Sequence, residues 1–239
     1  MTSRIAETSP RSAALIAGVG YLAIFGLAIY ANFFVRTGLV EPNDAAATFS
    51  NISDSEFLFR TGLVSFLIVF ILDVVIAWAL YVLFKAASKQ LSLLTAWFRL
   101  VYTVFLGVAL IFFFGVLQLV GGAGYLTAFE PGQLDAQVML LLEAFNYAWL
   151  IGLACFGVHL ILIGYLMLAS GLAPRVLGVL LAVAGIAYLI DTFAYALLSS
   201  YADYEAAFLV IVAVPSVVAE LAFTVWLLAR GGLPQEASQ

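Results

Sequence analysis

Long apolar runs occupy most of this chain, and they limit what it can fold into more than any other feature of the sequence. A helix that crosses the hydrocarbon core of a bilayer, roughly 30 Å thick, needs about 20 predominantly apolar residues. Runs of that length follow one another along the chain, separated by short polar segments. They predict an all-α protein, a polytopic transmembrane helical bundle of six spans. The predicted spans are Ser12–Phe34, Phe57–Phe84, Leu91–Val120, Ala136–Ala169, Val176–Ser200 and Ala207–Ala229.

The composition excludes an ordinary soluble domain. The chain is 65% hydrophobic and 10% charged, whereas soluble domains are about half apolar and about a quarter charged. The lipid bilayer is therefore the expected partner, and no basic stripe suits nucleic acid. We expect a single six-helix transmembrane domain over residues 12–230, between short cytoplasmic tails at 1–11 and 231–239.

The basic residues of the loops predict the orientation. Cytoplasmic loops of membrane proteins carry an excess of Lys and Arg. Arg36 and Arg60 fall on one side of the predicted topology, together with most of the loop acids. The other side holds Arg4, Arg11, Lys85, Lys89, Arg175 and Arg230. Both termini are accordingly predicted to be cytoplasmic, and the even number of spans agrees.

Five ionisable residues lie deep within the apolar runs, each in a different span. They are Asp73, Arg99, His159, Asp191 and Glu220. Such groups are costly inside a bilayer, so they are candidate functional residues by default. Counted from the cytoplasmic helix ends at the helical rise, Arg99 lies roughly 12 Å deep. Three of the others lie at a similar depth and Asp191 somewhat deeper, which predicts one buried polar layer with Asp73–Arg99 as its ion pair.

Helical spacing of polar residues supports this layer. On the third span Ser92, Thr95 and Tyr102 recur on the face of Arg99, and Tyr188 and Tyr195 accompany Asp191 on the fifth. On the sixth span Ser216 and Thr224 flank Glu220, and Pro215 frees a backbone carbonyl one turn before it. These stripes predict helix faces that line a shared interior. In the first span, Gly18, Gly20 and Gly26 predict close helix packing.

Two classes of function fit such a layer. The layer could bind or move a small molecule or protons, because three carboxylates face one fixed cation and at least one of them should be protonated or bind something. Alternatively, the buried pair only fixes helix packing in a structural or accessory membrane subunit without turnover. A lone histidine does not predict a metal centre, and no cofactor is expected. No complete catalytic set can be identified, so an intramembrane enzyme ranks third after these two classes and no catalytic residue is assigned.

Four stretches resemble one bacterial family. The strongest is GVHLILIGYLMLASGLAPRVLGVLLAVAGIAYLID at residues 157–191; RSAALIAGVGYLAI, WFRL and AELAFTVWLLARGG accompany it. Together they resemble the domain-of-unknown-function 4386 family over nearly the whole chain. The resemblance implies a six-span prokaryotic protein of the inner or plasma membrane. It implies no activity and transfers no catalytic residue.

Overall fold

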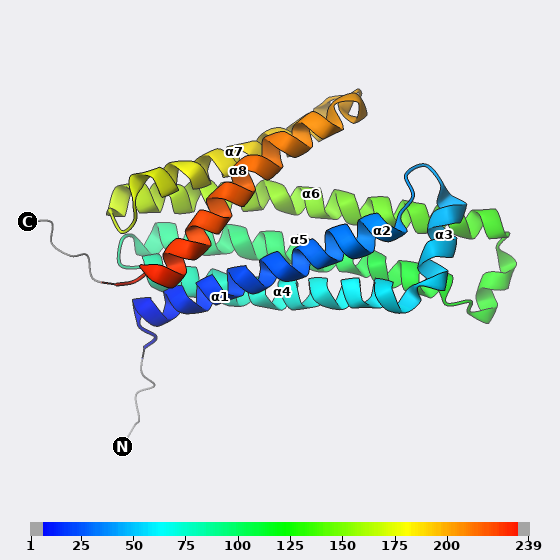
Figure 1. The fold of residues 1–239 in the computed structure, drawn as a ribbon, viewed down its shortest axis with the longest axis horizontal. Coiled ribbons are helices and arrows are strands. Elements are labelled where there is room, and N and C mark those ends of the chain that lie inside the picture. Colours follow the sequence, from blue (N-terminus) through cyan, green and yellow to red (C-terminus); the bar gives the residue numbers. More distant parts are fainter. Residues whose placement is uncertain (1–6, 234–239) are drawn as a thin grey trace, which may run out of the picture. The chain divides into compact units, whose positions relative to one another are not determined.

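Helices make up almost all of the regular structure in the computed structural model, which describes residues 7–233. Within that range, six helical segments are long and apolar enough to cross a membrane, and this confirms the predicted all-α architecture. Figure 1 shows the elements in chain order. They are α1 (Pro10–Ile29), η1 (Tyr30–Arg36), α2 (Thr37–Leu39), α3 (Ala45–Asp54), α4 (Glu56–Phe84), α5 (Lys89–Val120), η2 (Gly124–Ala128), α6 (Pro131–Ser170), α7 (Arg175–Leu197) and α8 (Tyr201–Ala229).

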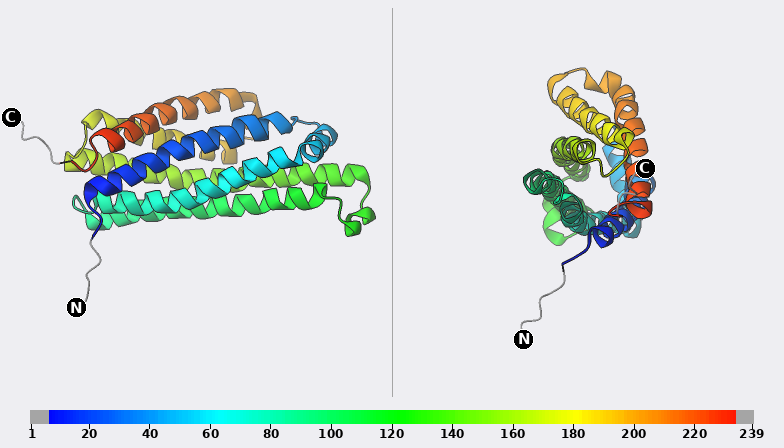
Figure 2. Two further views of the ribbon diagram at one scale, coloured as in Figure 1. Left: turned by 60° about the horizontal axis from the view of Figure 1, so that its bottom comes forward. Right: turned by 90° about the vertical axis from the view of Figure 1, so that its left-hand side faces the viewer.

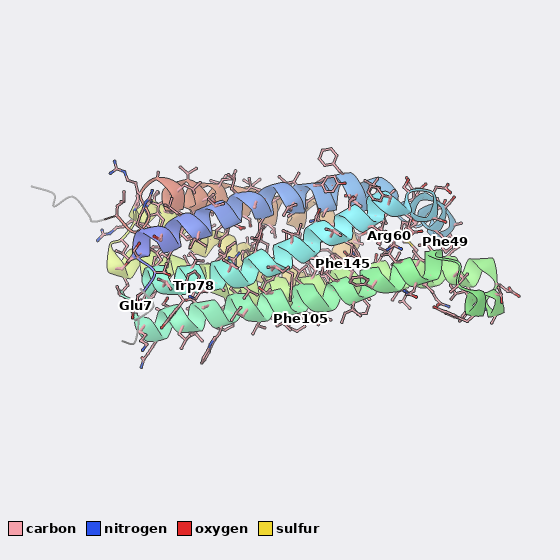
Figure 3. The ribbon with its side chains drawn as sticks, turned by 90° about the horizontal axis from the view of Figure 1, so that it is seen from below. Glu7, Phe49, Arg60, Trp78, Phe105 and Phe145 are labelled. Atoms are coloured by element: carbon pink, nitrogen blue, oxygen red, sulfur yellow. The ribbon has the colours of Figure 1, made fainter. Side chains whose placement is uncertain are left out.

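The outward-facing surface of these helices is apolar. Large hydrophobic side chains project from the long helices, such as Ile71, which is 60% exposed, and Ile111, which is 64% exposed. Trp78 of α4, labelled in Figure 3, is another exposed hydrophobic side chain. A soluble protein rarely exposes apolar patches of this extent. The exposed faces therefore suit contact with lipid, as the hydropathy of the six segments indicates.

The contacts divide the chain into two compact units. The first comprises residues 1–22, 73–102 and 153–239, and the second comprises residues 23–72 and 103–152. Helices α1, α4, α5 and α6 contribute residues to both units, whereas α7 and α8 belong to the first alone. The single domain predicted for residues 12–230 stays a prediction.

In the first unit, α6 and α7 approach each other through glycines. A Cβ atom built on Gly164 would lie 2.4 Å from the carbonyl oxygen of Gly178, and one built on Gly185 would lie 2.4 Å from that of Gly157. The turn between the two helices contains Gly171, whose φ of +67° favours glycine. Helices α7 and α8 also pack against each other and run antiparallel, joined by a short turn (Figure 2).

The first helix confirms part of the predicted glycine packing. Gly18 contacts Leu228 of α8 and Gly20 contacts Ile76 of α4 so closely that a Cβ atom on either would clash. Gly26 has open space around its Cβ position, so the predicted packing role is wrong for this glycine.

Aromatic rings form the core of the second unit. Phe113 and Phe145 stack with ring centroids 4.0 Å apart, and Phe59, Phe66 and Trp149 join the cluster. Such pairs add to the stabilisation that comes from burying their area. Phe145 of α6 is labelled in Figure 3.

The predicted end of the first span at Phe34 is wrong, because the helix continues through η1 and α2 to Leu39. Two side chains sustain the wider η1 turns: Asn32 donates to the carbonyl of Ala28, and Thr37 donates to that of Asn32. Arg36 therefore lies on a helix rather than in a loop, where it donates a hydrogen bond to Asn146 of α6.

The polar segment that follows is also more regular than the sequence indicated. Asp44 caps α3 by accepting a hydrogen bond of 2.9 Å from the backbone NH of Ala47. Thr48 accepts from the backbone NH of Glu41 and donates to its carbonyl, and Asn51 donates to the carbonyl of Leu39. The segment is thus a short helix tied back to the end of the first span.

Candidate functional site

Asp73 and Arg99 form the predicted ion pair. The Arg99 Nη2 atom of α5 lies 2.5 Å from Oδ1 of Asp73 on α4, and each residue is 1% exposed. Helices α4 and α5 are joined by a short turn, so two facing residues at similar depth are natural partners. The pairing offsets the cost of placing either charge alone in a low-dielectric interior.

The rest of the Arg99 guanidinium is surrounded by electron-rich groups. Its Nη1 atom donates a hydrogen bond of 2.5 Å to the hydroxyl of Tyr21 on α1. The guanidinium carbon lies 4.7 Å from the centre of the Tyr21 ring and 5.4 Å from that of Phe156 on α6. Both distances are within the range of cation–π attraction, which strengthens where water is excluded. The Arg99 side chain of α5 thus contacts residues of α1, α4 and α6.

His159 completes this group, and its hydrogen bonds define its protonation state. Its Nδ1 atom lies 2.9 Å from the carbonyl oxygen of Thr95, and its Nε2 atom lies 3.3 Å from Nη1 of Arg99. A carbonyl only accepts and a guanidinium only donates. Nδ1 therefore carries the hydrogen, Nε2 accepts, and the ring is neutral. The imidazole connects the backbone of α5 with its arginine, and both of its nitrogens are engaged.

Sequence reasoning did not identify Tyr21 as part of this cluster. Its signal is the buried face of α1, on which Ala14, Ala17, Gly18 and Tyr21 recur at helical spacing. The first three are small and allow close approach, and the fourth is the one residue of that set with a polar tip. Phe156 was missed for a plainer reason: a phenylalanine in an apolar span carries no sign that it will face a cation.

Glu220 has a different environment from Asp73. Its Oε1 atom accepts a hydrogen bond of 3.4 Å from the hydroxyl of Tyr188 on α7. The residue is half-buried, and it forms no ion pair within residues 7–233. The Tyr188 ring in turn contacts Phe156, with ring centroids 5.5 Å apart. Glu220 is therefore joined to the Arg99 cluster through two aromatic rings and not through a salt bridge.

Asp191 has a partner of its own near the end of α7. The hydroxyl of Tyr201, the first residue of α8, donates a hydrogen bond of 2.6 Å to its Oδ1 atom. Asp191 lies about one helical turn beyond Tyr188. Tyr201 was assigned to a loop from the sequence, whereas α8 begins there, and this difference hid the contact.

Several hydroxyls of the predicted stripes donate their hydrogen bonds to backbone carbonyls. Thr95 donates to the carbonyl of Leu91, Ser92 to that of Tyr81 and Thr224 to that of Glu220. In these three cases the polar group satisfies its helix or the neighbouring helix. Each of the three residues is 2% exposed, so they lie on buried helix faces; that these faces line one shared interior stays a prediction. Of the five predicted site residues, Asp73, Arg99 and His159 form one cluster, while Glu220 and Asp191 each pair with a tyrosine.

The helices and their interior define a class: a multi-pass membrane protein with a buried Asp–Arg pair. Residues 16–231 match the family described as Domain of unknown function (DUF4386), and the chain belongs to this family, as the resemblance predicted. It is 31% identical over 170 residues to an uncharacterized protein of Archaeoglobus fulgidus, a match that covers 71% of this chain and 83% of the relative. No solved structure matches the chain.

Proposed function

We propose that this protein binds a small molecule or a proton inside the cell membrane, and that Glu220 is the group that binds it. The observation that carries the proposal is the environment of this carboxylate. Glu220 lies within a membrane span, is half-buried, and has a phenol as its hydrogen-bond partner instead of a cation. An ionisable group in that position either gains a proton or binds a positively charged or hydrogen-bonding ligand.

The residues divide into two roles. The Asp73–Arg99–His159 cluster has an ion pair and several hydrogen bonds within the protein, and it serves as a scaffold that joins α1, α4, α5 and α6. Glu220 and Tyr188 form the exchangeable part, because a weak 3.4 Å hydrogen bond between α7 and α8 is easily replaced by one to a ligand. Asp191 lies about one turn from Tyr188 on α7 and has Tyr201 as its own hydrogen-bond partner.

Purified protein in lipid nanodiscs allows a direct test. The infrared carbonyl band of a protonated carboxylic acid is recorded over a pH series for the wild type, for Glu220→Gln and for the control Glu130→Gln, which changes an exposed acid outside the spans. We expect a pH-dependent band that disappears in Glu220→Gln and persists in the control. Thermal unfolding with a ligand library, run on the same three proteins, identifies a bound molecule. If Glu220→Gln matches the wild type in both measurements, Glu220 is not a binding group.

The alternative function is that of a structural or accessory membrane subunit. It is favoured by the number of contacts around Arg99, since a buried cluster held by an ion pair and hydrogen bonds can specify packing without any turnover. The two functions predict different results for Glu220→Gln. A structural role predicts altered stability with no change in any ligand response, whereas a binding role predicts the loss of a specific response in a protein that remains folded.

A further inference from the structure

A second candidate site lies in the second unit and includes none of the five predicted site residues. A cavity of about 390 Å³ opens where α5 ends and α6 begins. Phe49 of α3 (Figure 3) forms one wall, and Leu119, Leu126, Phe129 and Leu134 line most of the rest. Cavities that hold small molecules have volumes of roughly 300–1,000 Å³ and are mostly apolar with a few polar groups. This cavity meets both conditions.

The walls of the cavity are held in place without a ligand. Helix α3 is capped by Asp44 and fastened to the first span by Asn51. The η2 turn is closed by the hydrogen bond from Thr127 to the carbonyl of Gly124, and Gly122 adopts a φ of +65° to direct the chain into it. The cavity is therefore preformed, which lowers the entropic cost of binding.

One carboxylate lines the cavity. Asp135 is half-buried in the first turns of α6, and within residues 7–233 it forms neither an ion pair nor a side-chain hydrogen bond. The two arginines of this unit have other partners, because Arg60 pairs with Glu56 and Arg36 donates to Asn146. The charge of Asp135 is thus not offset by these cations. It is available to a positively charged group that enters the cavity.

We propose that this cavity binds a hydrophobic organic cation, whose apolar groups pack against Phe49 and Phe129 while its charge lies beside Asp135. The face of a phenyl ring attracts a cation and also packs against the apolar groups of a ligand. A carboxylate beside apolar walls selects a cation over a neutral or anionic molecule of the same shape. The proposal is independent of the proton or ligand that we assign to Glu220.

Two probes of the same shape and opposite charge test the proposal. Equilibrium binding of tetraphenylphosphonium and of tetraphenylborate is measured on the full chain in nanodiscs, with empty nanodiscs to subtract lipid partitioning. Four proteins are compared: the wild type, Asp135→Asn, the cavity-filling Ala123→Trp, and Glu130→Gln as an acidic neighbour that does not line the cavity. Size-exclusion profiles and thermal unfolding establish that each variant is folded.

We expect saturable binding of tetraphenylphosphonium by the wild type and by Glu130→Gln, with affinities within a factor of two of each other. Asp135→Asn should weaken it about fivefold to tenfold, as expected for the loss of one partly buried charge contact. Ala123→Trp should abolish it, and tetraphenylborate should show no saturable binding. The proposal is overturned if tetraphenylphosphonium binding does not saturate, if Ala123→Trp retains it, or if Asp135→Asn binds as well as the wild type. Equal binding of tetraphenylborate also overturns the proposed selectivity for cations.

Discussion

Arg99 keeps its charge in an apolar interior because each neighbour that we describe supplies electron density to it. Asp73 supplies a carboxylate, Tyr21 a hydroxyl and a ring face, and His159 a ring nitrogen. The sequence predicted the pair with Asp73, because a charge needs a countercharge and the two helices adjoin. It could not predict the neutral partners, since nothing in the sequence tells a tyrosine or phenylalanine that faces lipid from one that faces a charge.

Removing the arginine should destabilise the fold strongly. Arg99→Ala leaves the Asp73 carboxylate buried without its partner, and breaking such a pair costs about 3–5 kcal/mol. We expect a large loss of thermal stability and a lower yield of folded protein. Arg60→Ala is the matched control, because that arginine also pairs with an acid but lies 53% exposed, where such a pair contributes about 0–1 kcal/mol. Equal losses of thermal stability in the two variants would show that Arg99 does not form a buried ion pair with Asp73.

The Tyr21 hydroxyl should contribute separately from its ring. Tyr21→Phe keeps the ring face over the guanidinium and removes the acceptor of its 2.5 Å hydrogen bond. Hydrogen bonds to charged groups contribute about 1.5–3 kcal/mol. We expect a decrease of that order in the free energy of unfolding, measured by denaturant titration, and almost none for Tyr125→Phe, whose side chain is exposed. A Tyr21→Phe protein as stable as the wild type would exclude this role for the hydroxyl.

At the scale of the helices, the contact between α6 and α7 depends on the absence of side chains at the points of closest approach. A methyl group at residue 164 would meet backbone atoms of α7, which cannot rotate away. Gly164→Ala should therefore separate the helices and destabilise the protein by about 1–3 kcal/mol, the usual cost of overpacking. Gly26→Ala is the control, because nothing lies near its Cβ position and alanine favours a helix. Thermal unfolding compares the two, and a tolerated Gly164→Ala would contradict this close packing.

The sequence located the helices better than it located their ends. Apolar runs identify the part of a helix that must avoid water, and all six were found. A helix also continues wherever its backbone hydrogen bonds can be completed. Residues 35–39 and 201–206 contain polar residues and fell outside the predicted spans for that reason, although they extend the first and last spans. Asp191 was consequently expected to face the arginine layer, whereas the first residue of α8 holds it.

For the molecule as a whole, the proposed orientation has both termini in the cytoplasm, and it rests on the lysines and arginines at one set of helix ends. Reporter fusions test it at two positions. Residue 45 begins α3, and residue 172 lies in the turn between α6 and α7. A reporter that is active only after export should be active at residue 45 and inactive at residue 172. The reverse pattern would invert the topology. The cavity at the end of α5 and the start of α6 would then lie on the cytoplasmic side.

The wide turn at η1 has a consequence for how the chain can change in length. A π-helical turn accommodates one residue more than the α-helical turn that it replaces. The side chains before and after it therefore point in the same directions as they would in a continuous α-helix with one residue fewer. Deleting one residue between Tyr30 and Val35 should convert η1 into ordinary α-helix and leave Tyr21 and Arg36 directed towards their partners. The same deletion a few turns earlier would rotate everything beyond it by about 100°, the angle between successive residues of an α-helix. Single-residue deletions that survive within this span should therefore be concentrated in η1.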